Sequence, residues 1–235
     1  MSSQNYQQIK TIGFDADDTL WINETFFRDG EKEFAKLLTQ FETENKILQE
    51  IYRYEIKNLD LYGYGVKGFV LSMIECALEV SNHQINSKLM EEILEIGKRM
   101  LAKPVELLPG VIETLEALQP KYRLLLLTKG DLLDQERKLE KSGLTKYFHH
   151  VEVLSNKKEK NYKDLLDHLL VPENEFLMIG NSLKSDVLPV INIGGEAIHV
   201  PFHTTWEHER VEKTDQHNYQ TIDSLLELKM LLLDQ

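Results

Sequence analysis

From Pro104 onward, short apolar segments of strand length alternate with segments of helical periodicity. Apolar runs such as LLLLTKG and FLMIGNS end at polar residues, and helical patterns such as DLLDQERKLEKSG lie between them. Strands that alternate with helices are typical of a parallel sheet with helices on both faces. This alternation constrains the fold most, because it predicts an α/β protein with a doubly wound, Rossmann-like parallel sheet.

A further strand is predicted at residues 9–15, where IKTIGFD runs into an acidic cluster. Residues 21–103 place apolar side chains at helical spacing and contain no convincing strand. We therefore predict a core made of residues 1–20 and 104–235, with an all-helical cap domain, residues 21–103, inserted after the first strand. Such an insert leaves and rejoins the core near the carboxyl end of that strand, where ligands bind in open α/β sheets.

Net charge, cysteine content and the distribution of apolar residues exclude several classes of protein. The 235 residues carry a net charge of −12, which argues against a general nucleic-acid binder because phosphate backbones attract basic surfaces. The single cysteine, Cys76, allows no intramolecular disulfide, as is usual in a reducing compartment. No apolar run approaches the roughly 18 residues needed to cross a bilayer, and the start, MSSQNYQQIK, is polar. We expect a cytoplasmic protein without membrane or nucleic-acid partners, either monomeric or homodimeric.

Polar side chains gather at the ends of four predicted strands. Because the carboxyl ends of parallel strands meet at one edge of a sheet, these side chains are expected to converge. In chain order the residues at these strand ends are Asp15, Asp17, Asp18 and Thr19; Thr128 and Lys129, followed by Gly130; Lys157, Lys158 and Lys160; and Asn181, Ser182 and Asp186.

These motifs resemble those of the haloacid dehalogenase-like hydrolases. DADDT is similar to the first motif of that family, and Thr128 in LLLLTKG to the second. Lys157 best fits the third motif, with Lys160 as the alternative, and GNSLKSD with Asp186 fits the fourth. Because four motifs occur in order over nearly the whole chain, the resemblance is specific.

The resemblance implies a phosphatase that acts on a small phosphorylated metabolite. Asp15 would attack phosphorus and form an aspartyl-phosphate, and Asp17 would protonate the leaving oxygen and then activate water. Thr128, Lys129, Gly130 and Lys157 would bind the substrate's phosphate. An acid at position 17 favours phosphate esters over carbon–halogen bonds, because a halide leaves without a proton.

The resemblance also implies Mg²⁺, which prefers oxygen ligands. The expected ligands are Asp15, the backbone carbonyl of Asp17, and a group from the fourth motif. Many family members have aspartate where this chain has Asn181, so two arrangements stay open. Either Asp186 contacts the metal, or Asn181 does so while Asp186 orients Lys157.

Other functions stay open at this point. The amide at Asn181 is compatible with a phosphate-binding regulatory module without turnover, and a phosphomutase or dehalogenase of the same family is also an alternative. The segment FHTTWEHE, with His203 and His208, is interpreted as a surface loop after the last strand.

Overall fold

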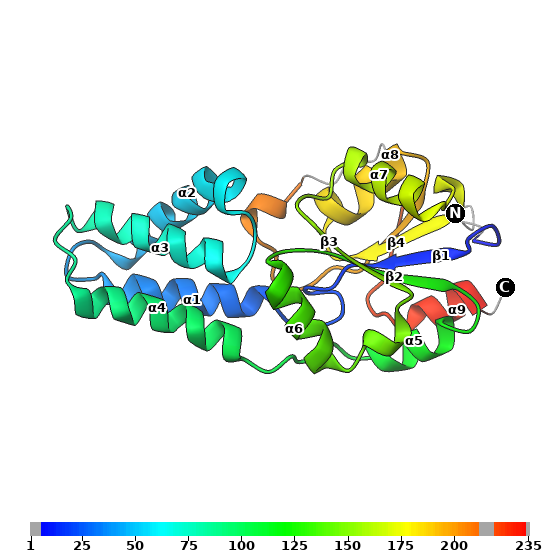
Figure 1. Ribbon diagram of the computed structural model, residues 1–235, viewed down its shortest axis with the longest axis horizontal. Coiled ribbons are helices and arrows are strands. Elements are labelled where there is room, and N and C mark those ends of the chain that lie inside the picture. The colour runs from blue at the N-terminus through cyan, green and yellow to red at the C-terminus, as the bar shows by residue number, and fades with distance from the viewer. Residues whose placement is uncertain (1–5, 212–218, 234–235) are drawn as a thin grey trace. The chain divides into compact units, whose positions relative to one another are not determined.

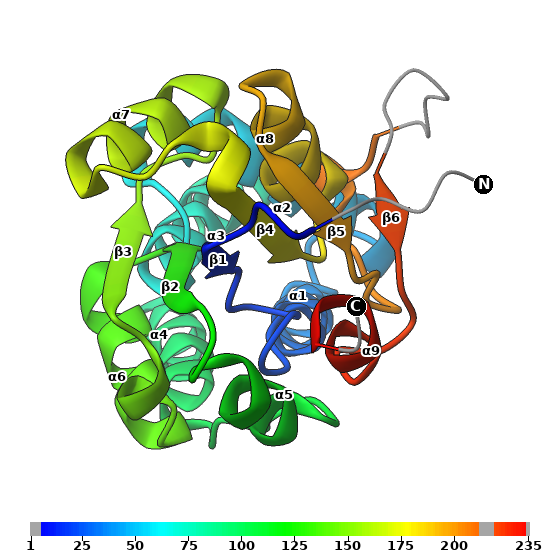
Figure 2. The same ribbon diagram turned by 90° about the vertical axis from the view of Figure 1, so that its right-hand side faces the viewer.

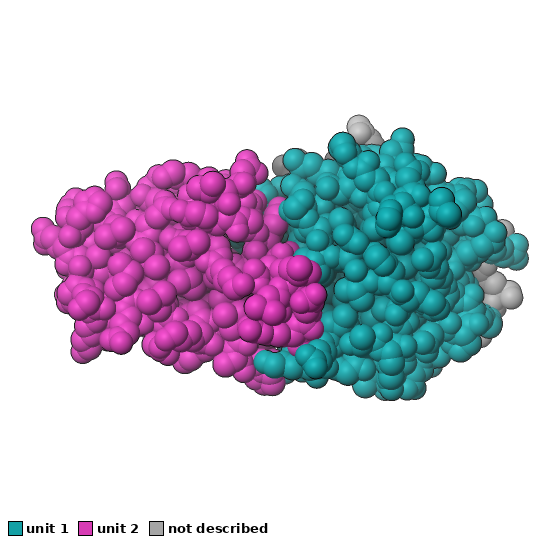
Figure 3. Space-filling model, in the orientation of Figure 1, with its two compact units in different colours: residues 1–22, 105–129, 138–235 teal, residues 23–104, 130–137 magenta. Residues whose placement is uncertain are grey.

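The computed structural model describes residues 6–211 and 219–233, which form two compact units. Unit 1 contains residues 1–22, 105–129 and 138–235, and unit 2 contains residues 23–104 and 130–137 (Figure 3). The segment 130–137, which the sequence placed in the core, thus groups with the helical residues. The prediction that residues 21–103 act as a separate cap domain stays a prediction.

Unit 1 is built on a parallel sheet of six strands in the order β3-β2-β1-β4-β5-β6 (Figures 1 and 2). The parallel sheet with flanking helices confirms the predicted fold class. The strands are β1 (Thr11–Phe14), β2 (Arg123–Lys129), β3 (His150–Leu154), β4 (Phe176–Gly180), β5 (Glu196–His199) and β6 (Gln220–Thr221). The first strand is shorter than predicted, and the two-residue β6 was not predicted.

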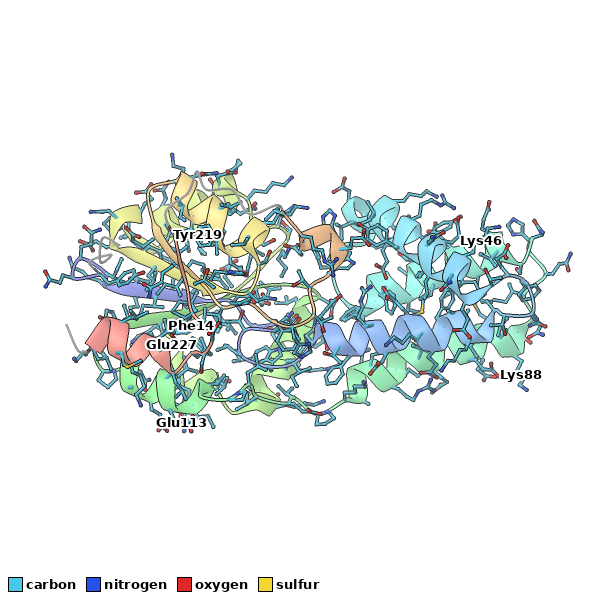
Figure 4. The ribbon with its side chains drawn as sticks, turned by 180° about the vertical axis from the view of Figure 1, so that it is seen from behind. Phe14, Lys46, Lys88, Glu113, Tyr219 and Glu227 are labelled. Carbon is cyan, nitrogen blue, oxygen red and sulfur yellow. The ribbon has the colours of Figure 1, made fainter. Side chains whose placement is uncertain are left out.

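Alternate side chains of the buried strands enter two different cores. Leu124 and Leu126 of β2 face one core, while Leu125 and Leu127 face the other. This follows from the two-residue period of a strand, so a continuous apolar run serves both faces. Phe14 of β1, labelled in Figure 4, belongs to the first core.

Helices cover both faces of the sheet (Figure 2). The first core includes side chains of α5 (Val111–Leu118), α6 (Leu132–Ser142) and α9 (Glu227–Leu233). The second core includes side chains of α7 (Glu159–Leu169) and α8 (Leu188–Asn192). A π-helical turn, Leu183–Val187, directly precedes α8.

Unit 2 has an apolar core of its own, to which the helices between residues 24 and 102 contribute. These are α1 (Glu24–Leu37), α2 (Glu44–Tyr62), α3 (Val66–Val80) and α4 (Ser87–Ala102). Phe34, Ile51 and Ile93 are fully buried in this core, whereas Lys46 and Lys88, labelled in Figure 4, are exposed. The amphipathic pattern of the sequence therefore predicted these helices correctly. None of the helices in the described residues has the length and hydrophobicity to span a membrane.

Candidate active site

The candidate site lies at the carboxyl ends of three adjacent strands. β1 pairs with β2 on one side and β4 on the other, with Phe14 opposite Leu126 and Ile179. Asp15 directly follows β1, and its backbone N–H donates to the carbonyl oxygen of Ile179 at 2.9 Å. The register therefore places the ends of β1, β2 and β4 side by side, as the sequence predicted.

A tight turn after β1 brings Thr19 back to Asp15. The backbone N–H of Leu20 donates to the carbonyl of Ala16 at 2.8 Å, and Asp18 adopts a left-handed conformation with φ of 61°. The Thr19 hydroxyl then donates to Asp15 Oδ2 at 2.9 Å. One carboxylate oxygen of Asp15 is thus held by its own loop.

Lys157 lies between two carboxylates. Its Nζ donates to Asp15 Oδ1 at 2.5 Å and to Asp186 Oδ1 at 2.7 Å, and the lysine is only 2% exposed. Burial opposes the charged form of Lys157, but Asp15 and Asp186 outweigh this effect and raise the pKa of the ammonium. Lys160 instead pairs with Asp164 in solvent. Of the two candidate lysines, only Lys157 therefore reaches Asp15.

The carboxylate of Asp186 is engaged on both oxygens. Oδ1 accepts from Lys157, and Oδ2 accepts from the backbone N–H of Ser182 at 2.9 Å. Gly180 is required beside it, because a Cβ at that position would collide with the Asp186 carboxylate. Asp186 is 1% exposed, so its contacts with Lys157 and the turn fix its orientation.

The environment of Asp15 disfavours its negative charge. Burial raises the pKa of Asp15 to about 7, against the lowering effect of Lys157 and with a further raising effect from Asp186. A cation bound to this carboxylate would favour its ionised form.

Asp17 has two donors on one oxygen. Trp21 Nε1 and Lys138 Nζ both donate to Asp17 Oδ1, each at 2.7 Å. Sequence reasoning missed Lys138, since a lysine in an amphipathic helix resembles a solvated residue. Only the packing of α6 shows that this lysine faces Asp17.

The three residues predicted at the end of β2 are divided by the boundary between the two units, which falls after Lys129. Thr128 is 1% exposed and lies within unit 1, and Lys129 donates to Ser185 Oγ at 2.9 Å and Glu209 Oε1 at 2.6 Å. Gly130 groups with unit 2, with φ of 139°, a conformation that favours glycine. The structure therefore brings Thr128 and Lys129 to the sheet edge, whereas Gly130 begins the segment that groups with unit 2.

Glu209 was not predicted. It lies in the loop after β5, within a short 3₁₀ turn, Glu207–Glu209. Its carboxylate accepts from Lys129 and from the hydroxyls of Ser182 and Ser185. The segment FHTTWEHE was interpreted as a surface loop, and no motif distinguished this glutamate from its exposed neighbour Glu207.

Oxygen atoms of the kind that coordinate Mg²⁺ lie beside Asp15. The Asn181 N–H donates to Thr19 Oγ1 at 3.1 Å, and Asn181 Oδ1 lies 3.5 Å from the same hydroxyl, which also holds Asp15. Within residues 6–211 and 219–233, no group of three or more His, Cys, Asp or Glu side chains is arranged to hold a metal. Mg²⁺ needs only one or two carboxylates and otherwise keeps water, so Asp15 with an amide oxygen fits that ion.

A model of the haloacid dehalogenase-like hydrolases matches residues 9–194, a range that includes every one of the predicted motifs. The chain belongs to this family. This haloacid dehalogenase-like hydrolase is 36% identical to a family hydrolase from Xanthomonas campestris, with a TM-score of 0.85 over 98% of this chain and 94% of that one.

Curated relatives of this hydrolase carry phosphatase names. It is 27% identical to the N-acylneuraminate-9-phosphatase of Mus musculus, over 96% of this chain and 94% of the relative. It is 26% identical to the pyrimidine 5′-nucleotidase YjjG of Escherichia coli, over 94% of this chain and 96% of the relative.

Proposed function

We propose that this hydrolase is a Mg²⁺-dependent phosphatase that cleaves a small phosphate monoester through a phosphorylated Asp15. The observation that carries the proposal is the buried contact of Asp15 with Lys157, which Asp186 holds from the other side. When all three groups are ionised, this cluster has a net negative charge. A site of this kind needs an added cation before it can accept an anionic phosphate.

Mg²⁺ would be held by the Asp15 carboxylate, the backbone carbonyl of Asp17 and the amide oxygen of Asn181. It would supply the positive charge that offsets the repulsion between the carboxylate and the phosphate. Asp186 contacts Lys157, and Asn181 contacts Thr19 beside Asp15, which supports the alternative in which Asp186 orients Lys157 and Asn181 faces the metal.

The side chains then divide the reaction between them. An oxygen of Asp15 attacks phosphorus while the bond to the ester oxygen breaks, and Asp17 gives its proton to the departing alkoxide. Asp17 next takes a proton from water, whose oxygen attacks the phosphorus of the acyl phosphate and regenerates the Asp15 carboxylate. Lys157 and Thr128 hold phosphate oxygens during both steps, and Lys129 supplies a further positive charge at the same edge.

The identity of the substrate is a separate question. The printed names of the relatives suggest two first classes to assay, phosphorylated sugar acids and pyrimidine 5′-nucleotides. A panel that contains both classes, together with simple sugar phosphates, would rank them by kcat/KM.

The proposal is tested with p-nitrophenyl phosphate and Mg²⁺. We expect turnover by the wild type, loss of turnover on chelation with restoration by Mg²⁺, and a fall of about three orders of magnitude or more in Asp15→Asn. Asp164→Asn is the matched control, because that aspartate lies on the surface of α7. Turnover that survives Asp15→Asn unchanged would reject the proposal.

A further inference from the structure

Glu209 holds three donors with one carboxylate. Its Oε1 accepts from Lys129 Nζ at 2.6 Å, and its Oε2 accepts from the hydroxyls of Ser182 and Ser185, each at 2.6 Å. Only 12% of the Glu209 side chain is exposed. A partly buried carboxylate with three charge-assisted or hydroxyl donors is held firmly in place.

The hydrogen bonds around Glu209 form a consistent, closed network. Ser185 Oγ donates to Glu209 and accepts from Lys129 at 2.9 Å. Ser182 Oγ donates to Glu209 and accepts from the backbone N–H of Ser185 at 3.1 Å. Each hydroxyl therefore uses its one proton on the glutamate, and the network needs an acceptor there with no proton of its own.

The network connects the loop after β5 to two other strand ends. Lys129 ends β2, while Ser182 and Ser185 belong to the turn after β4. The carboxyl ends of these strands carry the candidate active site, and the turn after β4 begins with Asn181.

A second series of hydrogen bonds connects the turn after β4 to Asp15. The backbone N–H of Ser182 donates to Asp186 Oδ2, and Asp186 Oδ1 accepts from Lys157. Lys157 in turn contacts Asp15. Two residues, Ser182 and Asp186, thus link Glu209 to Lys157 through hydrogen bonds.

We propose that Glu209 is a positioning residue for the phosphatase reaction: it fixes the ammonium of Lys129 and the turn that carries Asn181 and Asp186. This inference rests on the proposed function. In Glu209→Gln, Lys129 loses its counter-ion, and the single amide oxygen replaces only one of the two carboxylate oxygens that accept from Lys129 and from the serine hydroxyls. The strand ends of β2 and β4 are then no longer held to one another by side chains of this loop.

Two glutamates of the same turn provide a matched pair of variants. Glu209→Gln keeps the size of the side chain but removes the charge, and Glu207→Gln makes the same change at an exposed position. We expect kcat/KM for p-nitrophenyl phosphate to fall about tenfold or more in Glu209→Gln and to stay at the wild-type value in Glu207→Gln. Ser185→Ala, which removes one donor, should change kcat/KM in the same direction by less.

A double-mutant cycle separates positioning from a merely structural role. If Glu209 acts through Lys129, Glu209→Gln should cost much less in a Lys129→Met background than in the wild type. An effect that does not pass through Lys129 would instead reduce kcat/KM by the same factor in both backgrounds, and that result would overturn the claim that Glu209 positions the Lys129 ammonium.

A measurement independent of turnover completes the test. Trace acetylation with acetic anhydride, read by peptide mass spectrometry, should label Lys129 severalfold faster in Glu209→Gln than in the wild type or Glu207→Gln. If the wild type is active and the two glutamine variants match in both labelling and kcat/KM, the inference fails alone. If the wild type hydrolyses no phosphate ester, the proposed function fails and the inference falls with it.

Discussion

The strand ends of unit 1 and the apolar core of unit 2 bury different kinds of side chain. In unit 2, the core consists of aliphatic and aromatic residues such as Phe34, Ile51 and Ile93. At the strand ends of unit 1, Lys157 and Asp186 are buried as deeply, with 2% and 1% exposed. Apolar burial stabilises a fold wherever it occurs, whereas buried charges are costly unless each has its partners. The apolar core of unit 2 therefore stabilises the fold by burial alone, whereas the buried charges at the strand ends of unit 1 depend on one another as partners.

Among the substitutions considered, Lys157→Met is expected to change stability and turnover most. Lys157→Met leaves the buried carboxylates of Asp15 and Asp186 without their shared counter-ion, so we expect a loss of about 3–5 kcal/mol in the free energy of unfolding together with loss of turnover. Urea denaturation measures the first effect. Lys160→Met is the control, because its pair with Asp164 is exposed and should contribute less than about 1 kcal/mol. Equal losses in the two variants would contradict the assignment of Lys157.

A core truncation in unit 2 should affect stability but not chemistry. Phe34→Ala removes a fully buried ring, and we expect a loss of about 3–5 kcal/mol in unfolding free energy. At a temperature where the variant is folded, kcat for p-nitrophenyl phosphate should stay near the wild-type value. Leu94→Ala, at a half-exposed position of α4, is the matched control and should change both quantities little. A large fall in kcat for folded Phe34→Ala would contradict the expectation that the core of unit 2 affects stability but not turnover.

Glu209 is expected to make a smaller contribution to the free energy of unfolding, and this contribution depends on pH. Burial opposes its charge, but Lys129 and the hydroxyls of Ser182 and Ser185 lower its pKa from 4.5 to about 2. Because the folded pKa is below the unfolded one, the stabilisation is complete above about pH 4.5 and is lost as pH falls toward 2. The stabilisation that the Glu209 charge contributes is at most about 3 kcal/mol.

Denaturation of the wild type and Glu209→Gln over this pH range checks the sign. The difference in unfolding free energy should be largest near neutral pH and should shrink on acidification. Glu207→Gln should show no such trend. A difference that grows as pH falls below 4.5 would show that the carboxylate is not stabilised in its charged form.

Much of unit 1 could be predicted because strand and helix periods are local properties of the sequence. The runs that became β2 and β4 each contain four consecutive apolar side chains, and polar residues lie at or just beyond the end of each strand. Parallel pairing then places Asp15 and Asn181 at one edge without further information. Lys157 could be selected from a lysine-rich segment only by the family resemblance.

The parts that were missed depend on long-range packing. β6 has two residues, Gln220 and Thr221, and no apolar run, so only its pairing with β5 defines it. Lys138 and Glu209 are charged residues in segments where most charges are solvated. Their roles depend on which side chains they face across 121 and 80 positions of the chain, respectively, and no local period encodes such a contact.

The central claim is that Asp15 carries the phosphoryl group between the two steps. The most direct test is acid quenching during turnover of p-nitrophenyl phosphate with Mg²⁺, followed by peptide mass spectrometry. We predict a peptide that contains Asp15 with the added mass of one phosphoryl group, absent in Asp15→Asn and in samples without substrate. Steady turnover with a phosphoryl group on another residue, or with none on the protein at any quench time, would contradict the account.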